Sequence, residues 1–253
     1  MSTTVTYKGA TLTTVENETK TLKTAGTWME GDLTLTDVTQ GGGSGDALYK
    51  LLDKTIADSD IDWSQVTAVK DWAFYQCAQL TSVSNPVVRN LPGNGFRNCT
   101  GLTSAEITGT DQLQTYCGGM FRSDTALQTA TIHFAYSGND DVDFGDSYIF
   151  SGCSNLQTVI FTHSHATKTL KVRANWMFEN CTLFRNLVLK TTNMVTLTNG
   201  VNANAWGGLW NNPAESKIYV PSALISAYQT ATNWSTLYNH GISFVAIEGS
   251  EYE

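Results

Sequence analysis

The sequence lacks any run of basic residues and any long apolar run. Its 15 Lys and Arg are outnumbered by 23 Asp and Glu, which gives a formal net charge of −8 at pH 7. Nucleic-acid binding through phosphates needs clustered Lys and Arg, so we expect no nucleic-acid partner. No stretch reaches the roughly 18 successive apolar residues of a membrane-spanning helix, so we expect no membrane insertion. The opening MSTTVTYKGA lacks the basic and apolar regions of a signal peptide, so we expect no ordinary secretion route.

Cysteine is scarce, and the five that occur form no C-x-x-C pair. The usual zinc and thioredoxin motifs are therefore absent, and an odd total fits poorly with a disulfide framework. The 41% hydrophobic and 11% aromatic content is enough for a real core. This composition favours a globular protein of one or two domains over a disordered chain.

What the sequence does contain is an internal repeat. Five segments follow the outline F-x-x-C-x-x-L-x-x-V: FYQCAQLTSV (74–83), FRNCTGLTSAEI (96–107), FRSDTALQTATI (121–132), FSGCSNLQTVIF (150–161) and FENCTLFRNLVL (178–189). Asp124 replaces the cysteine in the third copy, and Phe184 replaces the leucine in the fifth. A sixth, degenerate copy, LWNNPAESKIYV (209–220), keeps only Leu209, Ile218 and Val220.

The repeat predicts a mainly β solenoid. Apolar residues three apart suit a tight turn rather than a helix or a strand, and endings such as TVIF are β-prone. One unit cannot bury its own apolar edge, so neighbouring units must stack with their strands in a short parallel sheet.

One repeat position carries four of the cysteines: Cys77, Cys99, Cys153 and Cys181. We predict that they form a buried column and pack as small apolar side chains, with a metal, redox or catalytic role as the alternative. Cys117 lies outside this column. Asp124 occupies the column position in the third repeat and is expected to be locally solvated, because an unpaired buried charge is costly.

The phrase VKDWAFYQCAQLTSV (69–83), with its echoes in the later copies, resembles the BspA-type leucine-rich repeats of bacterial surface proteins. The segment KIYVPSALISAYQTATNWSTL (217–237) is similar to the strand, Val-Pro and short helix that close such arrays. The resemblance covers residues 66–247. It implies a right-handed leucine-rich-repeat solenoid that is used for binding, often at cell surfaces, and has no enzymatic activity.

The C-terminal part predicts a cap for the solenoid. Pro221 and Ser222 are good helix starters, and an apolar stripe from Ala223 to Tyr228 indicates a helix that covers the open end of the sheet. The segment ISFVAI (242–247) predicts a final strand. Such a cap is needed because a terminal coil would otherwise expose an apolar face and an unpaired edge.

The N-terminal part differs from the repeats in composition. Residues 4–38 are rich in Thr and alternate apolar with polar residues, which predicts antiparallel strands. We therefore divide the chain into a small antiparallel β module (1–40), a flexible glycine-rich linker (41–46) and the solenoid with its cap (47–253). The stretch TKTLKTAGTWMEGDLTLT (19–36) is similar to short N-terminal modules of virion proteins from tailed bacteriophages. That resemblance implies an attachment domain.

Two segments contain residue types that bind metal ions. THSHA (162–166) places His163 and His165 on one face of a predicted strand, but no third ligand is near in the sequence. NDDVDFGD (139–146) has the oxygen spacing of a calcium loop, yet Phe144 stands where the loop needs glycine and no glutamate follows at the twelfth position. We expect ordinary polar histidines, a solvated acidic loop, no bound metal and no cofactor.

Five aromatic residues are candidates for ligand contact: Trp72, Tyr148, Trp176, Trp206 and Trp210. The first three hold the same position, two residues before the repeat phenylalanine, and the other two lie in the degenerate last coil. Exposed rings of this kind stack on sugars and anchor protein interfaces. We favour the interpretation that they pack between turns of unequal length, with ligand contact as the alternative.

Two classes of function follow, and neither is enzymatic, because no G-x-S-x-G or similar context joins the Ser, His and Asp residues. The first is a bacteriophage virion structural protein, on a tail, baseplate or head fibre, made in the bacterial cytoplasm and released by lysis. It would sit at the virion surface as a homo-oligomer, dock on virion proteins through residues 1–40, and present its repeats to a host-surface glycan or protein. The alternative is a bacterial cell-surface adhesin or interaction module with no virion role.

Overall fold

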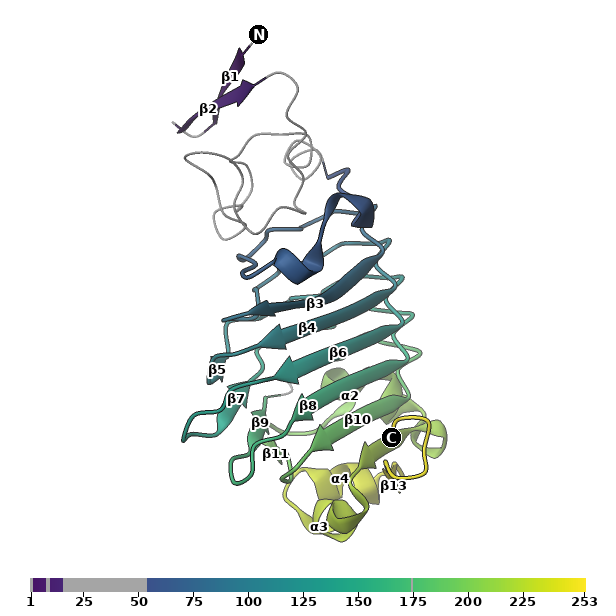
Figure 1. The fold of residues 1–253 in the computed structure, drawn as a ribbon. Coiled ribbons are helices and arrows are strands. Elements are labelled where there is room, and N and C mark those ends of the chain that lie inside the picture. Colours follow the sequence, from purple (N-terminus) through teal and green to yellow (C-terminus); the bar gives the residue numbers. More distant parts are fainter. Residues whose placement is uncertain (1, 8–9, 16–53, 174) are drawn as a thin grey trace.

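The computed structural model describes residues 2–7, 10–15, 54–173 and 175–253 (Figure 1). Strands β1 (Ser2–Tyr7) and β2 (Ala10–Val15) pair as an antiparallel hairpin. This agrees with the antiparallel strands predicted for the start of the N-terminal module. The remainder of that module and the 41–46 linker lie outside the described residues.

A seven-stranded parallel sheet forms one long side of the solenoid (Figure 1). Its strands are β3 (Ser82–Val88), β4 (Ser104–Gly109), β6 (Thr129–Phe134), β8 (Thr158–His163), β10 (Asn186–Thr191), β12 (Lys217–Val220) and β13 (Ser243–Ala246). They lie side by side in chain order. The first six are the β-prone ends of the six predicted repeats, so the mainly β, parallel solenoid is confirmed.

A second parallel sheet, which the repeat pattern did not predict, lies in the segments between repeats. Its four strands are β5 (Leu113–Gln114), β7 (Val142–Phe144), β9 (Leu170–Val172) and β11 (Thr196–Leu197). Strands of two or three residues leave too short an alternation to be recognised in a sequence. The second to fifth coils therefore contribute a strand to both sheets and then turn back (Figure 1).

The third side of the coil is a stack of six-residue turns, which we call the turn edge. It comprises residues 71–76, 93–98, 118–123, 147–152 and 175–180, in the first to fifth coils. The fourth residue of each turn is the repeat phenylalanine: Phe74, Phe96, Phe121, Phe150 and Phe178. Their buried rings stack in one column with successive centroids 5.3, 5.4, 5.5 and 5.6 Å apart. The predicted stacking of repeats therefore has an aromatic spine.

The cysteine column is also present, and its thiols make hydrogen bonds that apolar packing alone does not require. All five cysteines are free and buried. The Sγ of Cys153 donates to the carbonyl oxygen of Phe121 in the coil before it, at 2.9 Å. Cys99 and Cys181 repeat this contact with the preceding phenylalanine at 2.9 and 3.0 Å. Burial raises the pKa of the Cys77 thiol to about 12, and a protonated thiol is a poor nucleophile or metal ligand.

Asp124 corrects the sequence-based expectation of local solvation, because its side chain is fully buried in the cysteine column. Its Oδ1 accepts the backbone N–H of Cys99 at 2.8 Å, while its Oδ2 has no partner. Burial raises the pKa of the carboxyl well above its usual value, against the opposing effect of the Cys99 N–H. A protonated acid carries no charge, so it fits a column of thiols where a carboxylate would not.

The sixth coil begins three residues earlier than the repeat alignment predicted. Helix α2 (Ala203–Asn211) replaces the turn, and the Trp206 ring packs at a tilt against the Phe178 ring, with centroids 5.7 Å apart. The Phe178 N–H donates to the Ala205 carbonyl oxygen, as each earlier phenylalanine does to the next coil. Trp206 thus holds the phenylalanine position and Leu209 holds the cysteine position. The extra residues before β12 had hidden this register.

Short 3₁₀ helices and two α-helices close the ends. At the N-terminal end, η1 (Asp58–Asp60) and η2 (Trp63–Gln65) bring the buried Trp63 ring within 5.4 Å of Phe74. At the other end, η3 (Pro213–Glu215) precedes β12, while η4 (Ser222–Leu224), α3 (Ile225–Thr230) and α4 (Trp234–Asn239) lead to β13. Trp234 Nε1 donates to the Val195 carbonyl oxygen at 2.7 Å. The predicted helical cap and final strand are confirmed.

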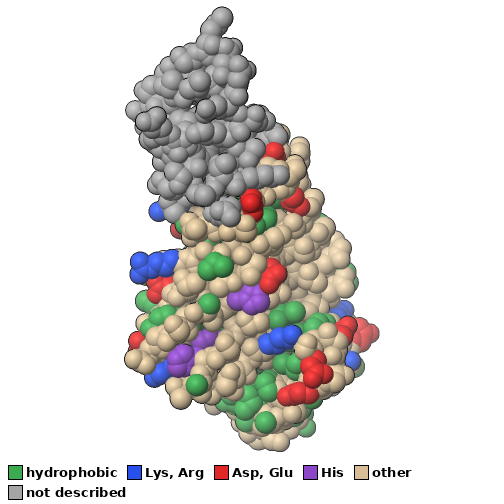
Figure 2. Space-filling model, viewed as in Figure 1, with side chains coloured by type: hydrophobic (Ala, Val, Ile, Leu, Met, Phe, Trp, Pro, Cys, Tyr) green, Lys and Arg blue, Asp and Glu red, His purple; other side chains and the backbone are tan. Residues whose placement is uncertain are grey.

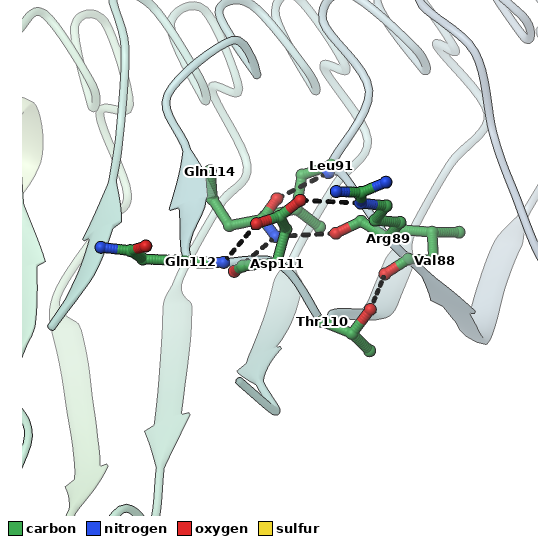
Figure 3. Close-up of polar contacts among 7 residues, drawn as sticks. All are labelled: Val88, Arg89, Leu91, Thr110, Asp111, Gln112 and Gln114. Carbon is green, nitrogen blue, oxygen red and sulfur yellow. Dashed lines mark hydrogen bonds and ion pairs between the residues drawn. The ribbon is translucent and has the colours of Figure 1, made fainter. Parts of the chain in front are cut away.

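A buried glutamine fixes the corner that leads into the second turn (Figure 3). Gln114 Oε1 accepts the Leu91 N–H at 2.8 Å, and its Nε2 donates to the carbonyl oxygens of Arg89 and Asp111 at 2.9 and 3.0 Å. Arg89 also pairs with the Asp111 carboxylate at 2.8 Å. These contacts hold the chain just before residue 93, where the turn edge of the second coil begins.

Candidate ligand-binding edge

The second residue of every turn on the turn edge has a left-handed backbone. The φ angles are 65° at Trp72, 51° at Asn94, 62° at Gly119, 66° at Tyr148 and 53° at Trp176. In the first four turns the N–H of this residue donates to the next coil, as from Trp72 to the Gly93 carbonyl oxygen at 3.0 Å. Glycine and asparagine adopt it easily, but it costs other residues about 1–2 kcal/mol.

Three turns therefore carry large aromatic residues where the backbone disfavours them. Trp72 and Tyr148 are half-buried, and Trp176 is 41% exposed. The rings of Tyr148 and Trp176 stack at 6.0 Å, while the Trp72 ring meets Tyr75 edge to face at 5.2 Å. Strain of this kind persists only where the surroundings enforce it, and it is concentrated at functional sites.

Arginines follow the phenylalanine in the second and third turns. The Arg97 guanidinium lies 5.6 Å from the Trp72 ring centroid, in the coil before it. The Arg122 guanidinium lies 4.6 Å from the Tyr148 ring centroid, in the coil after it. Both distances suit cation–π contact. The two arginines consequently lean in opposite directions along the solenoid.

Between them lies a hollow of about 320 Å³, which we call the edge hollow. It opens where Asn94 and Gly119 stand in place of the aromatic residues of the other coils. A side chain at residue 119 would collide with Asn94, since a Cβ there would lie 2.5 Å from its Oδ1. The hollow is lined by Asp71, Asn94, Arg97, Tyr116, Arg122, Asp146 and Tyr148, together with backbone of the same turns.

Two carboxylates hold the backbone at the rim of the edge hollow. Asp71 Oδ1 accepts the Gly93 N–H at 2.7 Å, and Asp146 Oδ1 accepts the Ser147 N–H at 2.7 Å. Tyr116 is 79% exposed beside them. The site thus combines anchored hydrogen-bond acceptors, guanidinium donors and one open aromatic ring.

The five predicted aromatic residues do not form one site. Trp72, Tyr148 and Trp176 lie along the turn edge, and their role in binding stays a prediction. Trp206 is only 1% exposed and packs in the core, so it is not available to a surface ligand. Trp210 lies at the C-terminal end, where its ring stacks on His240 at 3.7 Å. The repeat alignment starts the last copy at Leu209, so it does not assign Trp206 to the phenylalanine column.

Arg97, Arg122 and Tyr116 were missed as candidates. The two arginines had a signal in the sequence, since consecutive repeats begin FRN and FRS. Tyr116 had none, because it lies outside the repeat unit and becomes part of the site only when the coils stack.

The two histidines of THSHA lie side by side, although only the first is part of a strand. Strand β8 ends at His163, which is 3% exposed and has its Nδ1 3.0 Å from the Phe134 carbonyl oxygen. His165 lies beyond the strand, where its Nδ1 accepts the N–H groups of Thr167 and Lys168. The two rings stack with their centroids 6.2 Å apart, so the side chains do lie together, but the strand is shorter than predicted.

The acidic loop at 139–146 is bound to the next coil instead of being solvated throughout. Asp141 accepts the Thr169 N–H at 2.9 Å and pairs with Lys171 at 3.1 Å, and these contacts lower the pKa of its carboxyl. Asp143 forms a two-pronged ion pair with Arg173. Across the described ranges, no three His, Cys, Asp or Glu side chains cluster as a metal site would need.

The outer face of the long sheet carries mostly uncharged side chains in its described part (Figure 2). On this face, His133 lies 2.8 Å from Thr162 Oγ1 and 2.7 Å from Glu106 Oε1. The trio resembles an acid–histidine–hydroxyl chain, but β6 and β8 are interior strands whose backbone N–H groups pair with their neighbours. The backbone therefore offers no oxyanion site there, which a hydrolase needs.

Comparisons with known proteins place these features in context. Six copies of the family described as "BspA type Leucine rich repeat region" match residues 54–137 and 139–203. A solved structure of a leucine-rich repeat protein from Bacteroides ovatus ATCC 8483 is 17% identical, with a TM-score of 0.21. That match covers 73% of this chain and 64% of the other, so the chain spans less than two thirds of that protein. No curated protein matches. Within the described residues, no helix combines the length and apolarity required to cross a bilayer.

Proposed function

The chain belongs to the BspA-type leucine-rich repeat family, and from this premise we propose that it is a non-enzymatic binding protein whose turn edge contacts a host-cell surface. The observation that carries the proposal is the conflict between backbone and side chain at Trp72, Tyr148 and Trp176. Large rings held in a disfavoured conformation along one edge, of which the Tyr148 ring lines the edge hollow, are explained by ligand contact more readily than by packing.

The finer part of the proposal is a structural role in a bacteriophage virion, on a tail, baseplate or head fibre. Residues 1–40 attach the protein to virion proteins, and residues 47–253 face the host. The support is the resemblance of residues 19–36 to virion attachment modules. A small module of this size gains stability from a partner, and several copies in one assembly would convert weak contacts of the solenoid into avidity.

The virion role is tested by comparing full-length protein with a deletion of residues 1–40. Particles are purified from a host that makes either form, and their proteins are identified by mass spectrometry. We expect the full chain in particles and the deletion variant only in the soluble fraction, where it still binds host cells. Normal incorporation of the deletion variant would assign docking to the repeats instead.

The alternative function, a bacterial cell-surface adhesin or interaction module, shares the turn edge and differs in location. It predicts that purified particles contain neither form of the protein, while fractionated cells carry it at their surface. The same mass-spectrometric experiment therefore separates the two functions.

A further inference from the structure

The residues that line the edge hollow restrict the class of ligand that it can bind. This restriction rests on the proposed host-binding function. Two arginines line the hollow, and the guanidinium group of each lies against an aromatic ring. Because Arg122 lies against Tyr148 and Arg97 against Trp72, neither guanidinium is free to swing far from its ring. Held in this way, each presents N–H donors at the hollow at little further loss of side-chain entropy.

The two arginines have few partners of their own in the described part of the chain. Arg97 Nη1 makes one hydrogen bond, at 3.3 Å, to Asn94 Oδ1, and its Nε is buried without a partner. Arg122 forms no ion pair within the described part of the chain. A ligand that supplies acceptor oxygens could pair with the terminal guanidinium nitrogens of both arginines, although not with the buried Nε of Arg97.

Charge balance at the hollow argues against a strongly charged ligand. Two arginines and two aspartates line it, so its formal charge is zero. An anionic ligand would meet the carboxylates of Asp71 and Asp146, and a cationic ligand would meet the guanidinium groups. A hydroxyl group can accept from a guanidinium and donate to a carboxylate at the same time. Ligands rich in hydroxyl groups therefore match both sets of groups.

An aromatic platform completes the site. Tyr116 is 79% exposed, so most of its surface is accessible to a ligand. An amphipathic ring of this kind suits the apolar face of a sugar ring. The volume of about 320 Å³ lies at the lower end of the roughly 300–1,000 Å³ that small-ligand sites occupy.

We propose that the edge hollow binds an uncharged saccharide unit of a host-surface glycan. Sugar hydroxyl groups accept from Arg97 and Arg122 and donate to Asp71 and Asp146, and the ring stacks on Tyr116. The Trp72 and Tyr148 rings hold Arg97 and Arg122 in position beside the saccharide.

The proposal is tested with the full chain by titration calorimetry against matched trisaccharides. The neutral probes are trimers of glucose, galactose, mannose and N-acetylglucosamine. The charged probes are the glucosamine trimer, which is cationic, and the galacturonic acid trimer, which is anionic. We expect at least one neutral trimer to bind about tenfold or more tightly than either charged trimer, with an affinity that changes little between about 0.05 and 0.5 M NaCl. Tighter binding of a charged trimer, or no binding of any, would overturn the proposal.

Two substitutions test the assigned groups. Arg122→Ala and Tyr116→Ala should each weaken binding about tenfold, whereas Lys190→Ala, on the sheet face, should leave it unchanged. Folding is checked by the denaturation midpoint of each variant. Equal affinity of Arg122→Ala and the unaltered chain would contradict the site.

Binding of the same proteins to host cells separates this inference from the function on which it rests. Cell binding that persists when no trisaccharide binds would refute the saccharide site and leave host binding intact. Loss of both would refute both. Competition of cell binding by the neutral trimer would support both.

Discussion

The inward-facing and outward-facing residues of the turn edge belong to the same six-residue turns but differ in how much the residue type varies. Inward, the fourth residue is phenylalanine in all five turns, and the rings repeat at 5.3 to 5.6 Å. Outward, the second residue changes among tryptophan, asparagine, glycine and tyrosine, although the backbone there is left-handed every time. Stacking restricts an inward residue because it touches the same neighbour above and below. An outward residue has no such restriction, so its chemistry can serve a ligand.

The largest expected contrast comes from truncating one ring on each side. Phe121→Ala removes a buried ring from the middle of the stack and should destabilise the solenoid by about 3–5 kcal/mol. Tyr148→Ala, in the next turn, should cost no more than about 1 kcal/mol, because its ring is only half-buried. Chemical denaturation of both variants measures the difference. Similar losses would show that the outward rings are structural.

The second prediction concerns Asp124, which replaces cysteine in the buried column next to the phenylalanine stack. The pKa of its carboxyl is raised in the folded state, so the protonated carboxyl contributes its full stabilisation below the unfolded pKa of about 3.9. That contribution is lost as pH rises towards the folded pKa. Asp124→Asn keeps the acceptor for the Cys99 N–H and cannot ionise. We expect it to be more stable than the unaltered chain by roughly 1–3 kcal/mol at pH 8, with the gap closing near pH 4.

The measurement is the urea midpoint of both proteins across this pH range. Parallel curves for Asp124→Asn and the unaltered chain would mean that the buried carboxyl does not titrate with folding.

A smaller effect separates binding from packing at Trp176. Trp176→Asn copies the residue that the second turn uses at this position and relieves about 1–2 kcal/mol of backbone strain. It also loses the ring contact with Tyr148, which is worth about 0.5–1.5 kcal/mol. We expect the melting temperature to stay the same or rise slightly. A clear loss of stability would favour the packing interpretation of these aromatic residues.

The smallest expected effect is that of a reductant, which should leave stability unchanged. All five cysteines are free and buried, and the inward thiols donate to backbone carbonyl groups rather than pairing. A thiol reagent should label none of them in the folded protein and all five after unfolding without reductant. Recovery of fewer than five would reveal a disulfide.

Much of the fold could be predicted from the sequence because each coil repeats the same local pattern. The phenylalanine and cysteine columns, the strands at the repeat ends and the helical cap all follow from residues spaced a few positions apart. The burial of Asp124 was not predictable in this way, since it depends on a proton and on the Cys99 N–H of another coil. The register of Trp206 was hidden by three extra residues before β12.

The candidate site was harder to predict because it consists of differences between coils. Three of its aromatic residues share a repeat position and could be recognised. The edge hollow exists because Asn94 and Gly119 lack the aromatic ring that the other turns carry at this position. Tyr116 reaches the hollow from outside the repeat unit. Such a site becomes visible only when coils that are 22 to 29 residues apart in sequence are stacked.

The most direct test of the turn edge as the binding surface is to fill the edge hollow and measure binding of the full chain to host cells. Asn94→Trp repeats the residue found at the same position in the first turn, so it occupies the hollow in a conformation that this backbone already accepts. Thr131→Trp places the same ring on the outer face of the long sheet as a matched control. We predict that Asn94→Trp weakens cell binding about tenfold or more and that Thr131→Trp has no effect. Loss of binding by Thr131→Trp with full binding by Asn94→Trp would contradict the account and assign recognition to the sheet.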